Sequence, residues 1–179
     1  MFYKFFLYFV LLIQLFQHHV ESSSILTIKP TELIFDDTTV RGVGISPPAE
    51  SPMTVSGLSS TLSSTAVITV QIWFTHTYNG DCTIRFYHPD GTFITLSERR
   101  GSSYDNIFDG TLFSDSAANS VATYSFTKDG VISPLRPENP FTTFRGKAAN
   151  GVWKVWIIDN SAGDSGYLNR VKLTIVGMI

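Results

Sequence analysis

Residues 66–100, "AVITVQIWFTHTYNGDCTIRFYHPDGTFITLSERR", decide the fold of this chain. Their first part alternates between apolar residues on one face and polar residues on the other: Ile68, Val70, Ile72 and Phe74 against Thr69, Gln71 and Thr75. This period of two is typical of a half-buried strand, because successive side chains of a strand point to opposite faces. The stretch therefore predicts a sheet with one face in a core.

The second part of the same stretch predicts a hairpin. Two alternating runs are joined by His88-Pro89-Asp90-Gly91, where Pro presets the turn and Gly accepts a positive φ. Further strands are expected at 152–158 and 168–176, and no stretch shows sustained helical periodicity. Many short strands separated by glycine-bearing turns predict an all-β protein, an antiparallel β-sandwich of jelly-roll type.

Length and charge indicate one main domain. The chain has 179 residues and a formal net charge of −2, which argues against nucleic acid as a partner. Residues 1–22 are interpreted as a secretory signal peptide, because the apolar run from Phe5 is short and ends at His18 and His19. A retained membrane anchor is the alternative.

After the signal peptide, we expect an N-terminal extension and linker at 23–52, which could add an edge strand, and the main domain at 53–179. After cleavage the chain is expected to lie outside the membrane.

Two reactive side chains have simple structural interpretations. Cys82, the one cysteine, shares a strand face with Ile84 and Phe86 and is predicted to be a buried thiol; the alternative is an intermolecular disulfide. His76 follows Phe74 on the core-facing side of its strand, so we interpret it as a structural histidine rather than a general base. The sequence contains no GxSxG, HExxH or paired Cys/His motif.

Acidic and amide residues gather at the expected strand ends and turns. Calcium takes six to eight oxygen ligands from carboxylates and loop carbonyls, so these turns could hold it. The alternative is that the same residues only make turns. The residues concerned are Asp81, Asp105, Asn106, Asp159, Asn160 and Asp164.

Three longer strings carry a more specific signal: "THTYNGDCTIRFYHPDGTFITLSERRGSSYDN" at 75–106, "RPENPFTTFRGKAANGVWKV" at 136–155 and "IIDNSAGDSGYLNRVKLTI" at 157–175. Together they resemble the P domain, or homo B domain, of subtilisin-like proprotein convertases, over roughly residues 53–177. The resemblance implies a jelly-roll sandwich related to galactose-binding folds and a non-catalytic module that packs on a protease, supports its folding and tunes its calcium and pH dependence. Carried over to this chain, the candidate calcium ligands are Asp81, Asp105, Asn106, Asp159 and Asp164.

The expected strand "VWKVWII" departs from the family pattern. Its inward residues are Trp153, Val155 and Ile157, which leaves Trp156 and Ile158 on the opposite, normally polar face. These apolar side chains need to be covered, either by the N-terminal segment or by a partner protein. The residues of the N-terminal segment that could cover them are Ile25, Leu26, Ile28, Leu33, Ile34 and Phe35. The dibasic pair Arg99 and Arg100 lies in a turn, where we expect a structural arginine that pairs with Asp105 rather than a cleavage site.

Three functions follow as expectations. The first is a secreted, non-catalytic module that stabilises or regulates a subtilisin-like serine protease, or that acts as a calcium-braced interaction module with another extracellular protein. The second is a carbohydrate-binding jelly roll that uses Tyr78, Tyr104 and Tyr167. The third, a hydrolase with paired carboxylates, is disfavoured, because no residue before 53 could supply the family's catalytic domain.

Overall fold

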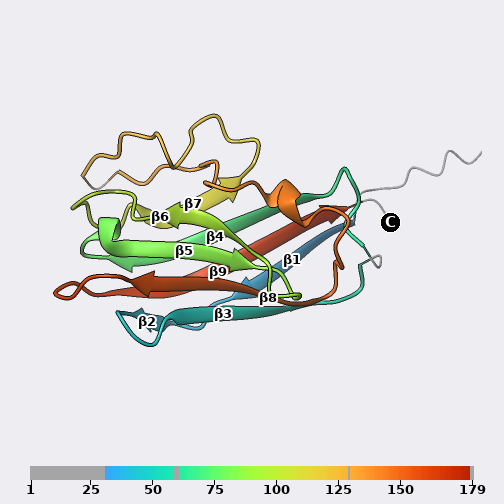
Figure 1. The fold of residues 1–179 in the computed structure, drawn as a ribbon, viewed down its shortest axis with the longest axis horizontal. Coiled ribbons are helices and arrows are strands. Elements are labelled where there is room, and N and C mark those ends of the chain that lie inside the picture. The colour runs from blue at the N-terminus through green and yellow to red at the C-terminus, as the bar shows by residue number, and fades with distance from the viewer. Residues whose placement is uncertain (1–30, 59–60, 129, 178–179) are drawn as a thin grey trace, which may run out of the picture.

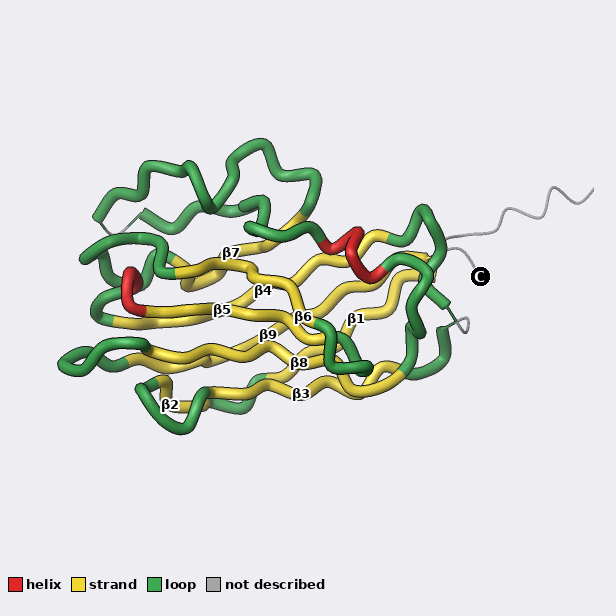
Figure 2. The backbone as a smooth tube through the Cα atoms, in the orientation of Figure 1, coloured by secondary structure: helices red, strands yellow, loops and turns green. Residues whose placement is uncertain are grey.

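A computed structural model describes residues 31–58, 61–128 and 130–177 (Figure 1). The expected signal peptide, and with it Ile25, Leu26 and Ile28, lies outside these residues. Nearly all the regular structure consists of strands, as the tube view shows (Figure 2). Within the described part of the chain, no helix has the length and apolar character needed to cross a membrane.

The strands form two antiparallel sheets that pack face to face. One sheet has the order β1 (Thr31–Asp37), β9 (Gly166–Gly177), β4 (Val67–His76) and β7 (Phe108–Ser114), with β2 (Arg41–Val43) also paired to β9. The other has the order β3 (Ala49–Val55), β8 (Gly151–Asp159), β5 (Cys82–Tyr87) and β6 (Phe93–Glu98). Two short 3-10 turns, η1 (Asn79–Asp81) and η2 (Phe141–Phe144), complete the elements. The all-β sandwich predicted from the sequence is confirmed.

The predicted alternation places the core between the sheets. Ile68, Val70, Ile72 and Phe74 of β4 are all buried, as are Trp153, Val155 and Ile157 of β8. Trp153 stacks on Phe86 with ring centroids 5.3 Å apart, and its indole N–H donates to the carbonyl of Ala149. Since the N–H is satisfied, this large side chain is fully buried without a polar penalty.

The hairpin joins β5 to β6 as predicted. Tyr87 pairs with Phe93, and the turn between them contains Gly91 at φ 87°. The imidazole of His88 is buried, and its Nε2 lies 2.7 Å from the carbonyl oxygen of Ala148. The turn is therefore held against the core as well as by its own strand pairing.

The described part of the N-terminal segment, which starts at Thr31, lies in the five-stranded sheet and not on the outer face of β8. Leu33, Ile34 and Phe35 lie in β1, which pairs with β9 in the other sheet, so the expectation that they cover Trp156 is wrong. Strand pairing explains the difference, because it satisfies the backbone hydrogen bonds of β1, whereas lying across a sheet face would not. The division of the chain at residue 53 stays a prediction, and β3 crosses that point.

Asp37, at the end of β1, ties the two sheets together. Its carboxylate accepts a 2.6 Å hydrogen bond from Ser51 of β3 and lies 2.8 Å from the guanidinium of Arg41. The backbone N–H of Thr39 donates to the same carboxylate. Burial alone would raise the pKa of Asp37, but these hydrogen bonds outweigh it and lower the pKa from 3.8 to about 2.

Because the folded pKa lies below the unfolded one, Asp37 stabilises the fold above about pH 4 and loses this contribution as the pH falls towards 2. We expect Asp37→Asn to lower the free energy of unfolding by about 1–2 kcal/mol at neutral pH. The variant should also flatten the loss of stability between about pH 4 and pH 2. Urea titrations of both proteins across this range measure the effect; parallel pH profiles would contradict it.

Candidate functional site

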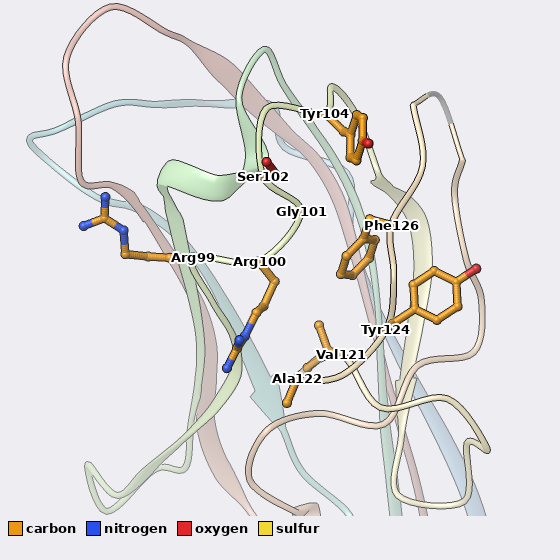
Figure 3. A pocket seen from close by; sticks show the side chains of 9 residues that line it. All are labelled: Arg99, Arg100, Gly101, Ser102, Tyr104, Val121, Ala122, Tyr124 and Phe126. Carbon is orange, nitrogen blue, oxygen red and sulfur yellow. The ribbon is translucent and has the colours of Figure 1, made fainter.

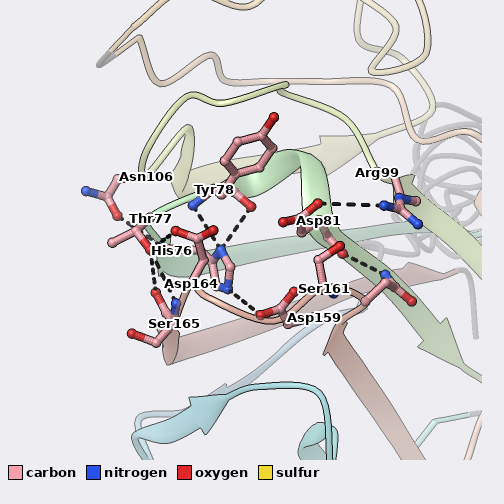
Figure 4. A network of polar contacts seen from close by, with 11 residues as sticks. His76, Thr77, Tyr78, Asp81, Arg99, Asn106, Asp159, Ser161, Asp164 and Ser165 are labelled. Atoms are coloured by element: carbon pink, nitrogen blue, oxygen red, sulfur yellow. Dashed lines mark hydrogen bonds and ion pairs between the residues drawn. The ribbon is translucent and has the colours of Figure 1, made fainter.

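Most of the predicted calcium ligands gather at the end of the sandwich where β4 leads into η1 (Figure 4). Asp81 ends η1, Asp159 ends β8 and Asp164 lies in the turn between β8 and β9. Asn106 comes from the loop before β7, and Asp105 precedes it. Among the described residues, no three His, Cys, Asp or Glu side chains are grouped so that they could hold a metal ion.

The polar side chains here are engaged mainly with the backbone. Asn106 brackets His76: its side-chain oxygen accepts the N–H of His76, and its own N–H donates to the carbonyl of His76. Asp164 accepts a 2.9 Å hydrogen bond from the hydroxyl of Thr77. Asp159 accepts the backbone N–H of Ser161. These contacts close the loops onto β4, which is the turn-making role that the sequence left open beside calcium.

His76 and Asp159 form a buried pair at the centre of this end. His76 Nδ1 lies 3.1 Å from the backbone nitrogen of Tyr78 and 3.0 Å from the carbonyl oxygen of the same residue. The other ring nitrogen, Nε2, is 3.5 Å from Asp159 Oδ2, and both of these atoms are buried without a hydrogen-bond partner. A serine nucleophile would need an accessible imidazole nitrogen, whereas Nδ1 contacts the backbone of Tyr78 and Nε2 is buried against Asp159. The geometry supports the structural interpretation of His76.

Cys82 lies beside this pair, since its backbone pairs with that of Asp159. It is a free thiol and only 1% exposed. Burial raises the pKa of the Cys82 thiol well above its ordinary value, and the charges of Asp159, Asp81 and Asp164 raise it further. A buried, protonated thiol reacts slowly, so the structure favours the buried-thiol interpretation over an intermolecular disulfide.

The two arginines of the dibasic pair are structural, but their partner was predicted wrongly. Arg99 lies 3.6 Å from Asp81, and Arg100 lies 2.8 Å from Glu138; neither forms its ion pair with Asp105. Glu138 comes from the long segment before η2, and its carboxylate also accepts a hydrogen bond from the backbone N–H of Glu98 at the end of β6. Long-range pairing of this kind has no local sequence signal.

A hollow of about 340 Å³ opens between this arginine turn and the loop that follows β7 (Figure 3). Tyr104, Tyr124 and Phe126 line it together with Arg100. Tyr104 was predicted as a carbohydrate contact, whereas Tyr78 and Tyr167 are not among the lining residues. The acidic residues Asp105, Asp159 and Asp164 do not line it either, and Asp159 is only 1% exposed, so the paired-carboxylate arrangement of a hydrolase is not present there.

The outer face of the four-stranded sheet carries Trp156 and Ile158, both half-buried. Arg85, the strand partner of Trp156 on β5, places its guanidinium carbon 5.1 Å from the Trp156 ring and 4.7 Å from the Phe93 ring. Phe93 is 44% exposed, and its ring centroid lies 5.0 Å from that of Tyr87. We name Trp156, Arg85, Phe93 and Tyr87 the aromatic–arginine face.

Sequence reasoning identified Trp156 and Ile158 but missed the other members of this face. The signal was present: Arg85 and Tyr87 occupy the outward positions of the same alternating run whose inward positions are Ile84 and Phe86. What the sequence could not provide was the register that sets β5 beside β8. Once Arg85 is known to pair with Trp156, the stacking follows.

Comparison with known proteins assigns the family. The model of the proprotein convertase P-domain matches residues 65–175, which is most of the chain. The chain belongs to the proprotein convertase P-domain family. This P domain is thus a member of a non-catalytic family that is associated with serine proteases and is typically extracellular.

Individual relatives are larger proteins. Leupeptin-inactivating enzyme 1 of Streptomyces exfoliatus is 32% identical over 142 residues, which cover 78% of this chain and 25% of the enzyme. The serine protease of Aeromonas sobria aligns with a TM-score of 0.44 and 15% identity over 83% of this chain and 28% of the protease. The structure of this protease in complex with the chaperone ORF2 aligns with a TM-score of 0.43 and 14% identity, over 93% of this chain and 29% of the protease chain. The P domain thus spans about a quarter of the length of these relatives.

Proposed function

We propose that this P domain is a secreted, non-catalytic module that binds a subtilisin-like serine protease and stabilises or regulates it. Family membership supports the class of partner. The aromatic–arginine face is the observation that carries the proposal, because large side chains are left partly exposed on a sheet face that would ordinarily be polar. Secretion is part of the proposal and is supported by the short apolar run at the N-terminus.

The composition of this face fits a protein interface. Trp, Tyr and Arg are the residues most enriched among those that dominate binding energy, and all three are adjacent here. Trp156 lies on β8, which is paired on both sides by β3 and β5, so the side chain stands on a rigid backbone. A rigid aromatic anchor loses little conformational entropy on binding. The face can therefore bind without prior rearrangement.

A direct test uses the catalytic domain of a subtilisin-like convertase produced without its own P domain. We expect wild-type chain to bind it and raise its melting temperature, and Trp156→Thr to weaken binding by about tenfold or more. Tyr167→Thr is the matched control, since Tyr167 is an aromatic residue of the other sheet that is 55% exposed. Calorimetry measures binding, and thermal melts of each free variant show that it is folded.

Equal affinity of the wild type and Trp156→Thr would remove this face from the proposal. Loss of binding in Tyr167→Thr instead would move the interface to the five-stranded sheet. If the wild type does not bind any such catalytic domain, the protease partner itself is wrong.

Calcium bracing is a second part of the proposal. Asp81 and Asp164 lie in neighbouring loops at one end, and loop carbonyls there could complete an oxygen cage. With so few carboxylates, such a site would be weak, of the order of millimolar. We expect calcium at this level to raise the melting temperature, chelator to reverse the rise, and Asp164→Ala to abolish it. Asp109→Ala, an exposed acidic change on β7, serves as the control. A melting temperature that does not change with calcium would contradict the proposed calcium binding.

The hollow in Figure 3 favours carbohydrate as the second candidate ligand. Its aromatic lining beside the Arg100–Glu138 ion pair offers ring surfaces and fixed polar groups, which are common in ligand sites. The same set of proteins separates the two functions. Glycan retention that survives Trp156→Thr but is lost in Tyr124→Ala would assign the chain to carbohydrate binding.

A further inference from the structure

Two arginines of this P domain stack on aromatic rings, and they differ in one respect. Arg170 of β9 places its guanidinium carbon 4.4 Å from the ring of Trp73, and Asp36 of β1 binds the same guanidinium through both carboxylate oxygens, at 2.9 and 2.5 Å. Arg85 of β5 has two rings, Phe93 and Trp156, but no carboxylate: among the residues that the structure describes, it forms no ion pair.

The position of Arg85 makes the missing carboxylate informative. The side chain is half-buried, and its Nε is buried without a hydrogen-bond partner. A buried donor without a partner is costly, and a planar guanidinium held between rings has its hydrogen-bonding edge fixed in direction. The rings hold the guanidinium of Arg85 as Trp73 holds that of Arg170, but no carboxylate among the described residues pairs with it.

One pair of charges, on the neighbouring strands β8 and β3, is already neutralised. Lys154, on β8, lies over the ring of Tyr87 at 5.1 Å and forms a 2.7 Å ion pair with Glu50 of β3. Glu50 is opposite Trp156 in the strand register, and its carboxylate is engaged by Lys154. What remains at the centre of the aromatic–arginine face is one unpaired cation framed by apolar rings.

We propose that Arg85 is the recognition residue of this face and that it binds an aspartate or glutamate carboxylate presented by a partner protein between apolar side chains. The partner's carboxylate would bind the Arg85 guanidinium as Asp36 of β1 binds that of Arg170. The apolar side chains beside that carboxylate in the partner would pack on Trp156 and Phe93. Charge complementarity selects this occupant over a purely apolar segment, which would leave the cation unpaired in the interface.

This inference rests on the proposed function for the site of binding but does not require the partner to be a protease. The test therefore uses a random peptide library displayed on phage, selected on folded, immobilised chain. Arg85→Gln removes the charge and Arg85→Lys retains it without the planar fork. Arg170→Gln is the matched control, because it removes a stacked arginine whose carboxylate comes from the chain itself. Thermal melts of all four proteins show that each is folded.

We expect the wild type and Arg170→Gln to enrich peptides that carry Asp or Glu beside aromatic or aliphatic residues, and Arg85→Gln to lose this acidic preference. Selected peptides should bind Arg85→Gln about tenfold or more weakly, and Arg85→Lys with an intermediate affinity. Enrichment without acidic residues, or an acidic preference that survives in Arg85→Gln, would overturn the proposal. Acidic peptides that bind at Arg85 while no convertase domain binds would retain this inference and reject the protease function.

Discussion

The architecture depends on one constraint, the alternation of side chains along β8 between its two neighbours. Because β8 pairs with β3 on one side and β5 on the other, its register is fixed twice. Trp153, Val155 and Ile157 must then point into the core, where they are fully buried. The same rule forces Trp156 and Ile158 outwards, and a shift by one residue would exchange the two sets. The exposed aromatic face is thus a direct consequence of a strand that cannot slip.

Three sites of the sandwich differ in how completely their polar groups are satisfied. At the acidic end, Asn106 and Asp164 close loops by binding backbone and hydroxyl groups, while Asp159 Oδ2 and His76 Nε2 are buried against each other without a hydrogen-bond partner. At the sheet edge, Asp36 completes the Arg170–Trp73 stack. The aromatic–arginine face has the same kind of stack without its carboxylate. Among these sites, it is the Arg85 guanidinium, stacked on rings and without a carboxylate among the described residues, that points to a partner.

Local patterns predicted the sandwich because alternation and turn chemistry are read within a few residues. The inward positions of β4 and β8 and the hairpin at Gly91 followed from period and residue type alone. The ion pairs Arg100–Glu138 and Arg99–Asp81 did not, because loop closure and strand register decide them. For the same reason β1, expected as a cover, adds to the edge of β9. On the outer face of β8, the sequence predicted only Trp156 and Ile158 as exposed apolar residues. The structure adds Arg85, Phe93 and Tyr87, because the register places β5 beside β8.

Hydroxyl-radical footprinting of the bound P domain locates the interface, because it reports the solvent exposure of individual side chains in the complex. With a subtilisin-like catalytic domain bound, we expect reduced oxidation of Trp156, Phe93 and Tyr87 and unchanged oxidation of Tyr167. Unchanged oxidation at those three positions, with protection of Tyr104 and Tyr124 instead, would place the interface at the hollow and contradict the account.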